Sequence, residues 1–208
     1  MERKTPLYQT HVDAGGKIVE FGGFLMPVQY PTGVLAEHMA VRQKAGLFDV
    51  SHMGELRLKG PDAVANVQKL ITADISAMQD GDIKYAMFCN DAGGILDDFI
   101  VYRCAADDYW LVVNAGNRDK DAAWVESHLF GDVDYRDEGD DWGQVALQGP
   151  KSGDILKKLC AEQYIPAKYY TFIDNVPLDL GSRTIHALVS QTGYTGEYGF
   201  ELYCRAED

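Results

Sequence analysis

The sequence has few of the residues that mark secreted, membrane-spanning or zinc-binding proteins. It contains four cysteines, none in a CxxC pair, so neither a zinc site nor a disulfide framework is expected and a reduced cytosol is the simplest prediction. No apolar run approaches the length of a membrane span. The first residues, MERKTPLYQTHVDAGG, hold an early Glu and no apolar core, which predicts neither a signal nor a transit peptide. We therefore expect a cytoplasmic protein with no metal and no membrane partner.

Basic residues are also scarce, with 19 Lys and Arg against 32 Asp and Glu, a formal net charge of −13. Nucleic-acid binding depends on neutralising phosphates, so this balance argues against a nucleic-acid partner. It still allows an anionic small molecule held by a local basic pocket. A chain of 208 residues that is 46% hydrophobic is an ordinary globular protein with room for one large or two small domains.

Motifs for phosphate binding and for serine hydrolysis are missing. The sequence contains no GxGxxG, no phosphate loop ending in Lys-Ser or Lys-Thr, and no GxSxG. Ser51 and His52 are adjacent, but adjacent side chains in extended backbone diverge, which argues against a catalytic pair. We interpret His52 as a turn or core histidine.

One pattern occurs twice, on either side of the polar segment YRDEGDDWG, residues 135–143. GELRLKGPDAVANVQKL (54–70) and GQVALQGPKSGDILKKL (143–159) align without a gap. Each predicts a short strand and then a Gly-Pro pair opening a helix, since proline suits a first helical turn. The pattern predicts an α+β protein of two similar halves joined by a loop; chance similarity, and a surface turn within one domain, are the alternatives. The predicted buried stripes are Val64, Val67 and Ile71, then Ile155, Leu156 and Leu159.

Further elements follow from periodicity and from stop signals. A helix is predicted over 34–45, ended by Gly46, and another over 118–130 that buries Trp124, Val125 and Leu129. The segment DYWLVVNAGN predicts a strand that ends at Asn114. Residues 183–204 predict two strands joined by a glycine-rich turn.

The segment GGILDDFIVYR places two adjacent carboxylates, Asp97 and Asp98, in an apolar strand. The simplest interpretation puts Asp97 in the turn and Asp98 at an exposed strand edge. Alternatively, a hairpin centred near Ala106 sets Asp98 opposite Asn114. Asp98 would then be partly desolvated, with a raised pKa that suits it to hold or pass a proton.

The segment SQTGYTGEYGFELY repeats glycine every third residue at Gly193, Gly196 and Gly199, with tyrosines between them and Glu201 on the strand that follows. Glycines permit tight turns or close approach to a ligand, and tyrosines offer flat faces with a hydrogen-bonding tip. A bulged hairpin with exposed aromatics explains the pattern equally well. Together with the two aspartates, the segment suits a flat organic ligand that carries amine nitrogens.

Six segments occur in an order that resembles the glycine cleavage system T-protein family, the aminomethyltransferases. They are TPLYQTHVDAGGKIVEFGGFLMPVQY, GLFDVSHMGEL, GGILDDFIVY, LVVNAGN, ALQGP and SQTGYTGEYGFEL. The resemblance implies a folate-binding α+β fold with two lobes on antiparallel sheets. The first lobe would be discontinuous and ferredoxin-like, from 1–50 and 139–208, and the second would span 51–138. The β-rich third domain of the family would be absent.

The resemblance also implies an activity and its site. The family moves the methylene carbon from the aminomethyl-dihydrolipoyl arm of the H-protein to tetrahydrofolate and releases ammonia. Asp98 matches the family's key aspartate, near N10 of folate, with Asp97 a turn or supporting group. Glu201 matches the glutamate that binds the amino-pyrimidine end of the pterin. Other matches to the folate site are Tyr194, Tyr170 and Tyr85, with Met53, Tyr102 and Asn114 as further candidates.

Family chains continue well beyond FELYCRAED, through arginines that bind the carboxylates of the folate tail. Two alternatives to the full activity therefore stay open. The chain could be a non-catalytic folate-binding fragment, or it could be related to the folate-dependent factors of iron-sulfur assembly and tRNA modification.

Overall fold

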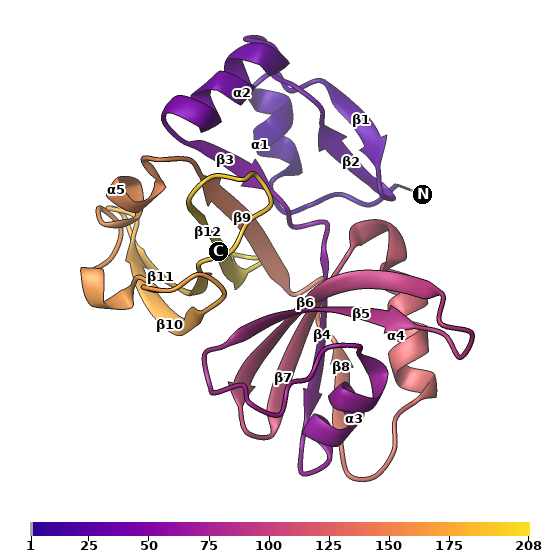
Figure 1. Cartoon of the computed structure of the whole chain (residues 1–208). Helices are drawn as coiled ribbons and strands as arrows, with labels where there is room; N and C mark the ends of the chain where they lie inside the picture. The colour runs from indigo at the N-terminus through magenta and orange to yellow at the C-terminus, as the bar shows by residue number, and fades with distance from the viewer. Residues whose placement is uncertain (1) are drawn as a thin grey trace. The chain divides into compact units, whose positions relative to one another are not determined.

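The structure, a computed structural model, describes residues 2–208 and divides the chain into two compact units (Figure 1). Unit 1 joins the described residues up to His52 to Trp142–Asp208, and unit 2 is Met53–Asp141. These boundaries lie near those expected for the two lobes, and the ferredoxin-like character of the first lobe stays a prediction. Within residues 2–208, no helix is long and apolar enough to cross a bilayer.

Unit 2 is one five-stranded antiparallel sheet with two helices, α3 (Ala63–Leu70) and α4 (Arg118–Ser127), packed on it. The strand order is β5-β6-β7-β4-β8. The strands are β4 (Gly54–Lys59), β5 (Ile83–Cys89), β6 (Ile95–Ala105), β7 (Asp108–Val113) and β8 (Asp134–Asp137), and a short 3-10 turn, η1 (Ala115–Asn117), precedes α4.

Alternation along the strands sends one apolar row toward the helices. Leu56, Leu58, Tyr109, Leu111 and Val113 are almost completely buried there and share one core cluster with α3 and α4. In α3 the expected stripe is partly wrong. Val67 and Ile71 are buried, but Val64 is exposed and the buried positions also include Ala63 and Leu70. In the second helix Val125 is fully buried, and Trp124 and Leu129 are partly buried against the same core.

Unit 1 contains a second five-stranded antiparallel sheet, in the order β10-β11-β12-β9-β3, and a separate two-stranded sheet, β1-β2. Its strands are β1 (Ile18–Phe21), β2 (Phe24–Pro27), β3 (Gly46–Asp49), β9 (Trp142–Gln148), β10 (Phe172–Asp179), β11 (Thr184–Ser190) and β12 (Gly199–Arg205). Its helices are α1 (Tyr8–Asp13), α2 (Val34–Gln43), α5 (Ser152–Leu156) and the 3-10 turn η2 (Glu162–Tyr164). Leu156 of α5 is fully buried on this sheet, and Ile155 and Leu159 pack beside it. The α+β prediction is confirmed.

Four predicted boundaries are wrong. The helix expected over 118–130 ends at Ser127. Helix α2 ends at Gln43, and Gly46 begins β3 rather than capping the helix. A Cβ at position 46 would lie 2.5 Å from Cγ2 of Val41, so glycine lets the strand pass close to the helix. The strand expected to end at Asn114 ends at Val113. The expected loop over 135–143 is shorter, because β8 takes its first residues by pairing Tyr135 with Leu58 and β9 begins at Trp142.

Candidate functional site

The two aspartates of β6 point to opposite faces of the unit 2 sheet. Asp97 shares the helix-covered face with Phe99 and Val101, and it is 5% exposed. Asp98 lies on the other face and is exposed. The expectation of Asp97 in a turn is wrong, because β6 begins at Ile95 and takes both aspartates into the strand. The expected desolvation of Asp98 is also wrong: the polar side chains and solvent around it leave its carboxylate open.

Asn114 lies opposite Asp98, as the hairpin register predicts, but it binds the Asp98 backbone, and it is Tyr85 of β5 that binds the carboxylate. Ile100 pairs with Val112, and this register, extended by two residues, sets Asp98 opposite Asn114. Asn114 Nδ2 donates to the Asp98 carbonyl oxygen at 2.7 Å, and Tyr85 Oη donates to Asp98 Oδ2 at 2.8 Å. Oδ1 of Asp98 remains available as an acceptor for an incoming N–H group.

Asp97 lies at the centre of a buried polar cluster on the opposite side of β6. Its carboxylate accepts hydrogen bonds from Asn114 Nδ2 at 3.0 Å, Asn117 Nδ2 at 2.7 Å and the Asn114 backbone N–H at 3.3 Å. Burial alone would raise its pKa, but the neighbouring Asp121 and hydrogen bonds from Asn114 and Asn117 outweigh burial and lower it. Asn114 therefore links both aspartates.

Glu201, on β12 in unit 1, is a partly buried carboxylate with neutral partners. Thr192 Oγ1 donates to Oε2, and Gln144 Nε2 donates to Oε1 at 3.2 Å. Burial raises the pKa of Glu201 because these two hydrogen bonds offset burial only in part. No Lys or Arg in residues 2–208 forms an ion pair with it. A carboxylate has about four acceptor positions, so Glu201 can still accept from a ligand.

The glycine-rich turn before β12 is shaped by one glutamine. The Gln148 amide donates to the carbonyl oxygens of Thr192 at 3.0 Å and Phe200 at 3.1 Å. A Cβ at Gly193 or Gly199 would lie within 2.5 Å of the Gln148 side chain, and Gly193 has a φ of +153° that also favours glycine. These glycines therefore serve local packing. Tyr194, at the tip of the turn, is fully exposed.

Tyr170 has a strained backbone beside Glu201. Its φ of +62° is unusual for a residue other than glycine, and strain of this kind concentrates at functional positions. Burial raises the pKa of Tyr170, and the charges of Tyr169 and Glu201 raise it further. The Tyr170 hydroxyl is therefore neutral at pH 7.

The remaining candidate site residues, Tyr102 and Met53, differ in solvent exposure. Tyr102 shares the face of Asp98 but is fully buried beside Trp110, with ring centroids 5.8 Å apart. Met53 is partly buried. His52 packs edge-on against Phe21 and Phe24, as expected of a core histidine, and Ser51 Oγ donates to the Gln144 carbonyl oxygen.

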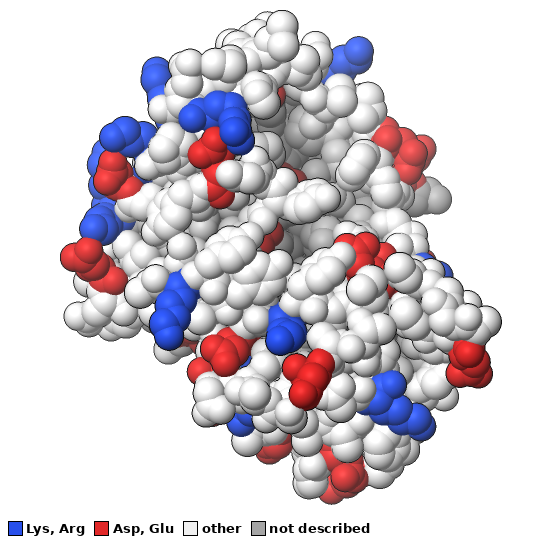
Figure 2. Space-filling model, viewed as in Figure 1, with Lys and Arg blue, Asp and Glu red and all other residues white. Residues whose placement is uncertain are grey.

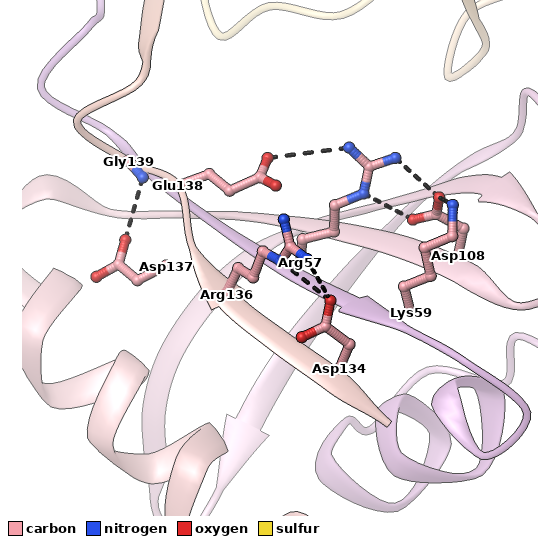
Figure 3. Close-up of polar contacts among 8 residues, drawn as sticks. All are labelled: Arg57, Lys59, Asp108, Asp134, Arg136, Asp137, Glu138 and Gly139. Carbon is pink, nitrogen blue, oxygen red and sulfur yellow. Dashed lines mark hydrogen bonds and ion pairs between the residues drawn. The ribbon is translucent and has the colours of Figure 1, made fainter. Parts of the chain in front are cut away.

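Away from the candidate carboxylates, basic residues of unit 2 form ion pairs with neighbouring acidic residues. In Figure 3, Arg57 makes a two-pronged contact with Asp108, Nε to Oδ1 and Nη2 to Oδ2, both 2.8 Å, and Lys59 lies 3.1 Å from the same carboxylate. A cavity of about 480 Å³ there is lined by Arg57, Lys59, Asp134, Arg136 and Glu138. On the face shown in Figure 2, basic side chains lie among acidic ones without forming one basic patch. Residues 2–208 contain no group of three His, Cys, Asp or Glu side chains that could hold a metal ion.

Sequence reasoning missed the residues that hold the candidate carboxylates. Asn117 and Asp121 support Asp97, and Thr192 and Gln144 support Glu201. The spacing of Asp121 and the apolar Val125, four residues apart on one helical face, was the available signal.

Comparison with known proteins assigns the family. The model described as "GCVT N-terminal domain" matches residues 7–208. The chain belongs to this family. Two relatives of the GCVT chain are both named aminomethyltransferase. The protein of Anoxybacillus flavithermus is 46% identical over 100% of this chain and 56% of its own length. The protein of Staphylococcus haemolyticus is 48% identical over 99% of this chain and 56% of its own length.

Solved structures agree with the GCVT fold. The glycine cleavage system aminomethyltransferase T from Bartonella henselae matches with a TM-score of 0.87 and 33% identity, over 100% of this chain and 55% of that one. The heterotetrameric sarcosine oxidase from Corynebacterium sp. U-96 matches at a TM-score of 0.64 and 16% identity, which supports the fold alone. The chain thus spans about half the length of the relatives that it matches.

Proposed function

We propose that the chain provides folate-handling residues of an aminomethyltransferase of glycine cleavage. The reaction would transfer the methylene carbon from the aminomethyl-dihydrolipoyl arm of the H-protein to tetrahydrofolate and release ammonia. Family membership supports this reaction, and the geometry of Glu201 carries the proposal. Glu201 is a partly buried carboxylate with neutral partners and unused acceptor positions.

Glu201 would bind the amino-pyrimidine end of the pterin. That end presents adjacent N–H donors, and an ionised carboxylate accepts two such bonds strongly. Thr192 and Gln144 fix the carboxylate from one side, so its orientation does not depend on a cation. Tyr170 and Tyr194 of unit 1 would line the pterin, with the backbone at Tyr170 already in an unusual conformation.

Asp98 would orient the N10 region of folate and assist proton movement as N5 attacks the methylene carbon. Its Oδ2 is held by Tyr85, and its backbone is held by Asn114. A carboxylate fixed in this way can receive an N–H proton at Oδ1 without reorganising. Met53 is carried over as a contact, and the fully buried Tyr102 as a support. Much of the rate would come from holding the reacting atoms together while water is excluded.

A second candidate function is folate binding without turnover. It is favoured by the unused acceptor positions of Glu201, which suit a bound pterin whether or not transfer follows. Binding and turnover are therefore to be measured separately, and the first measurement is calorimetric titration of tetrahydrofolate into the chain.

We expect Glu201→Gln to weaken tetrahydrofolate binding between about 10- and 100-fold, because it replaces a charged acceptor with an amide. Binding to the parent should also weaken as the pH falls toward the raised pKa of Glu201, since only the ionised form accepts two N–H bonds. Glu207→Gln, an exposed carboxylate near the same strand, is the matched control. Unchanged binding by Glu201→Gln contradicts the proposed role.

Transfer from an aminomethylated H-protein, followed as methylenetetrahydrofolate formed, tests Asp98. We expect Asp98→Asn to lower turnover by about 100-fold or more while binding changes much less, with the exposed Asp91→Asn as control. A parent chain that binds folate but shows no transfer supports the binding-only function.

A further inference from the structure

Asp121 is a buried carboxylate that the proposed function does not use. It lies on α4, its side chain is 0% exposed, and neither of its oxygens accepts a hydrogen bond from an N–H group in residues 2–208. After burial, the carboxylate of Asp97 on β6 is the group that acts on Asp121 most strongly. Two carboxylates in contact can hydrogen-bond only if one of them carries a proton.

The surroundings place that proton on Asp121. Asp97 accepts three N–H bonds from Asn114 and Asn117, which favour its ionised form. Burial first, and the Asp97 contact second, raise the pKa of Asp121 to about 8. The charged or titratable groups that act on Asp121 are Asp97 from β6 and Lys120 from its own helix. Lys120 Nζ lies 3.8 Å away and donates to the Leu96 carbonyl oxygen.

We propose that Asp121 is a positioning residue: its neutral carboxyl group donates a hydrogen bond to Asp97 and thereby fixes Asn114 beneath Asp98. The connection runs through a few bonds. Asp121 orients Asp97, Asp97 binds Asn114 through both the side chain and the backbone, and Asn114 Nδ2 holds the Asp98 carbonyl oxygen at 2.7 Å. The part of this inference that concerns Asp98 rests on the proposed function, whereas the shared proton does not.

Infrared spectroscopy tests the shared proton directly. The spectrum of the parent minus that of Asp121→Asn should show the carbonyl band of a buried neutral carboxylic acid at pH 6, and this difference band should disappear as the pH rises through about 8. The subtraction cancels the band of Glu55, a second buried carboxyl group whose pKa is raised by burial. The matched control Asp119→Asn, an exposed carboxylate on the same helix, should give no difference band. If the parent minus Asp121→Asn spectrum contains no such band at pH 6, the proposal is overturned.

The stability of unit 2 gives a second readout. A raised folded-state pKa means that the contribution of Asp121 is complete below about pH 4 and is lost as the pH rises toward 8. Asp121→Asn keeps an N–H donor toward Asp97 and cannot ionise. Its stability relative to the parent should therefore increase across that window, measured by chemical denaturation at each pH. A relative stability that does not change with pH contradicts the proposal.

Tetrahydrofolate binding then tests positioning. Asp121→Asn should bind within about twofold of the parent at pH 7, and Asp121→Leu, which has no donor, should bind about tenfold more weakly. Equal binding by folded Asp121→Leu contradicts positioning even if the shared proton is found. If the parent itself binds no folate, the proposed function fails, while the infrared and stability results still decide the protonation of Asp121.

Discussion

The sheets of the two units repeat one order of elements, but helices cover them to different extents. The ungapped repeat aligns β4 with β9 and α3 with α5, and the strand orders extend this match around each sheet. The full set of matches is β4 with β9, β5 with β10, β6 with β11, β7 with β12, and β8 with β3. In unit 2, helix α4 follows β7 and packs on the sheet beside α3.

Matched side chains on β8 and β3 differ in how deeply they are buried. Tyr135 on β8 pairs with Leu58, packs on the core, and its hydroxyl donates to the Ala122 carbonyl oxygen in α4 at 3.3 Å. Its counterpart Leu47 on β3 pairs with Leu147 and is 68% exposed. Leu47 and Leu147 line an apolar groove of about 430 Å³. One strand pattern therefore gives a closed core in unit 2 and a partly open one in unit 1.

The largest expected difference in the free energy of unfolding concerns β7 and β12, the strands that pair with the repeated strands β4 and β9. Leu111 on β7 and Leu202 on β12 occupy matched positions, opposite Leu56 and Val145. Leu111→Ala should cost about 4 kcal/mol and Leu202→Ala about 2 kcal/mol, because Leu111 is fully buried in the core with α4 whereas Leu202 lines the apolar groove. Hydrogen exchange read separately in each unit measures both costs. Equal costs would remove the distinction between a closed and an open core.

A smaller loss of stability is expected on the sheet face away from the helices. There, Arg57 in unit 2 matches Ala146 in unit 1. Asp108→Asn should cost about 1–3 kcal/mol at pH 7, because Arg57 and Lys59 lose a nearly buried partner. Burial raises the pKa of Asp108, but Arg57 and Lys59 lower it overall. The stabilisation is therefore present above the ordinary aspartate value of 3.8 and is lost as the pH falls through the lower folded-state value.

Denaturation at pH 7 and at pH 3 measures this difference, which should shrink at the lower pH. Asp134→Asn is the control. Its partner Arg136 is 66% exposed, so the change should stay within about 0.5 kcal/mol.

The smallest effect is expected at the open edge of unit 1. Leu47→Lys should change stability by less than about 0.5 kcal/mol, because the side chain is already in solvent. The matched Tyr135→Lys should cost about 2 kcal/mol or more, because it removes a packed side chain beside α4. Thermal unfolding of both variants measures these two stability changes. A large loss of stability in Leu47→Lys would mean that the groove is closed in solution.

Local patterns predicted the short-range geometry well. The hairpin centred near Ala106 gave the Asp98–Asn114 contact, since a tight turn fixes register on both sides of it. The repeat GELRLKGP and GQVALQGP gave both strand-to-helix units. These features depend on residues close together in the chain.

Contacts between distant residues could not be read in this way. The burial of Asp97 depends on Asp121 and Asn117, which α4 and its preceding turn bring onto the sheet, and a strand pattern alone cannot show what packs on it. The role of Gly46 depends on Val41 and on pairing with Gln148. The support of Glu201 by Gln144 joins residues 57 positions apart.

Strand β3 also has a consequence for synthesis on the ribosome. It pairs with β9, with Asp49 opposite Val145, so the edge strand of unit 1 is made long before its partner. All of unit 2, Met53–Asp141, leaves the ribosome in between. The first complete five-stranded sheet to emerge is therefore the one in the middle of the chain, and Leu47 and Phe48 have no partner strand until β9 has been translated.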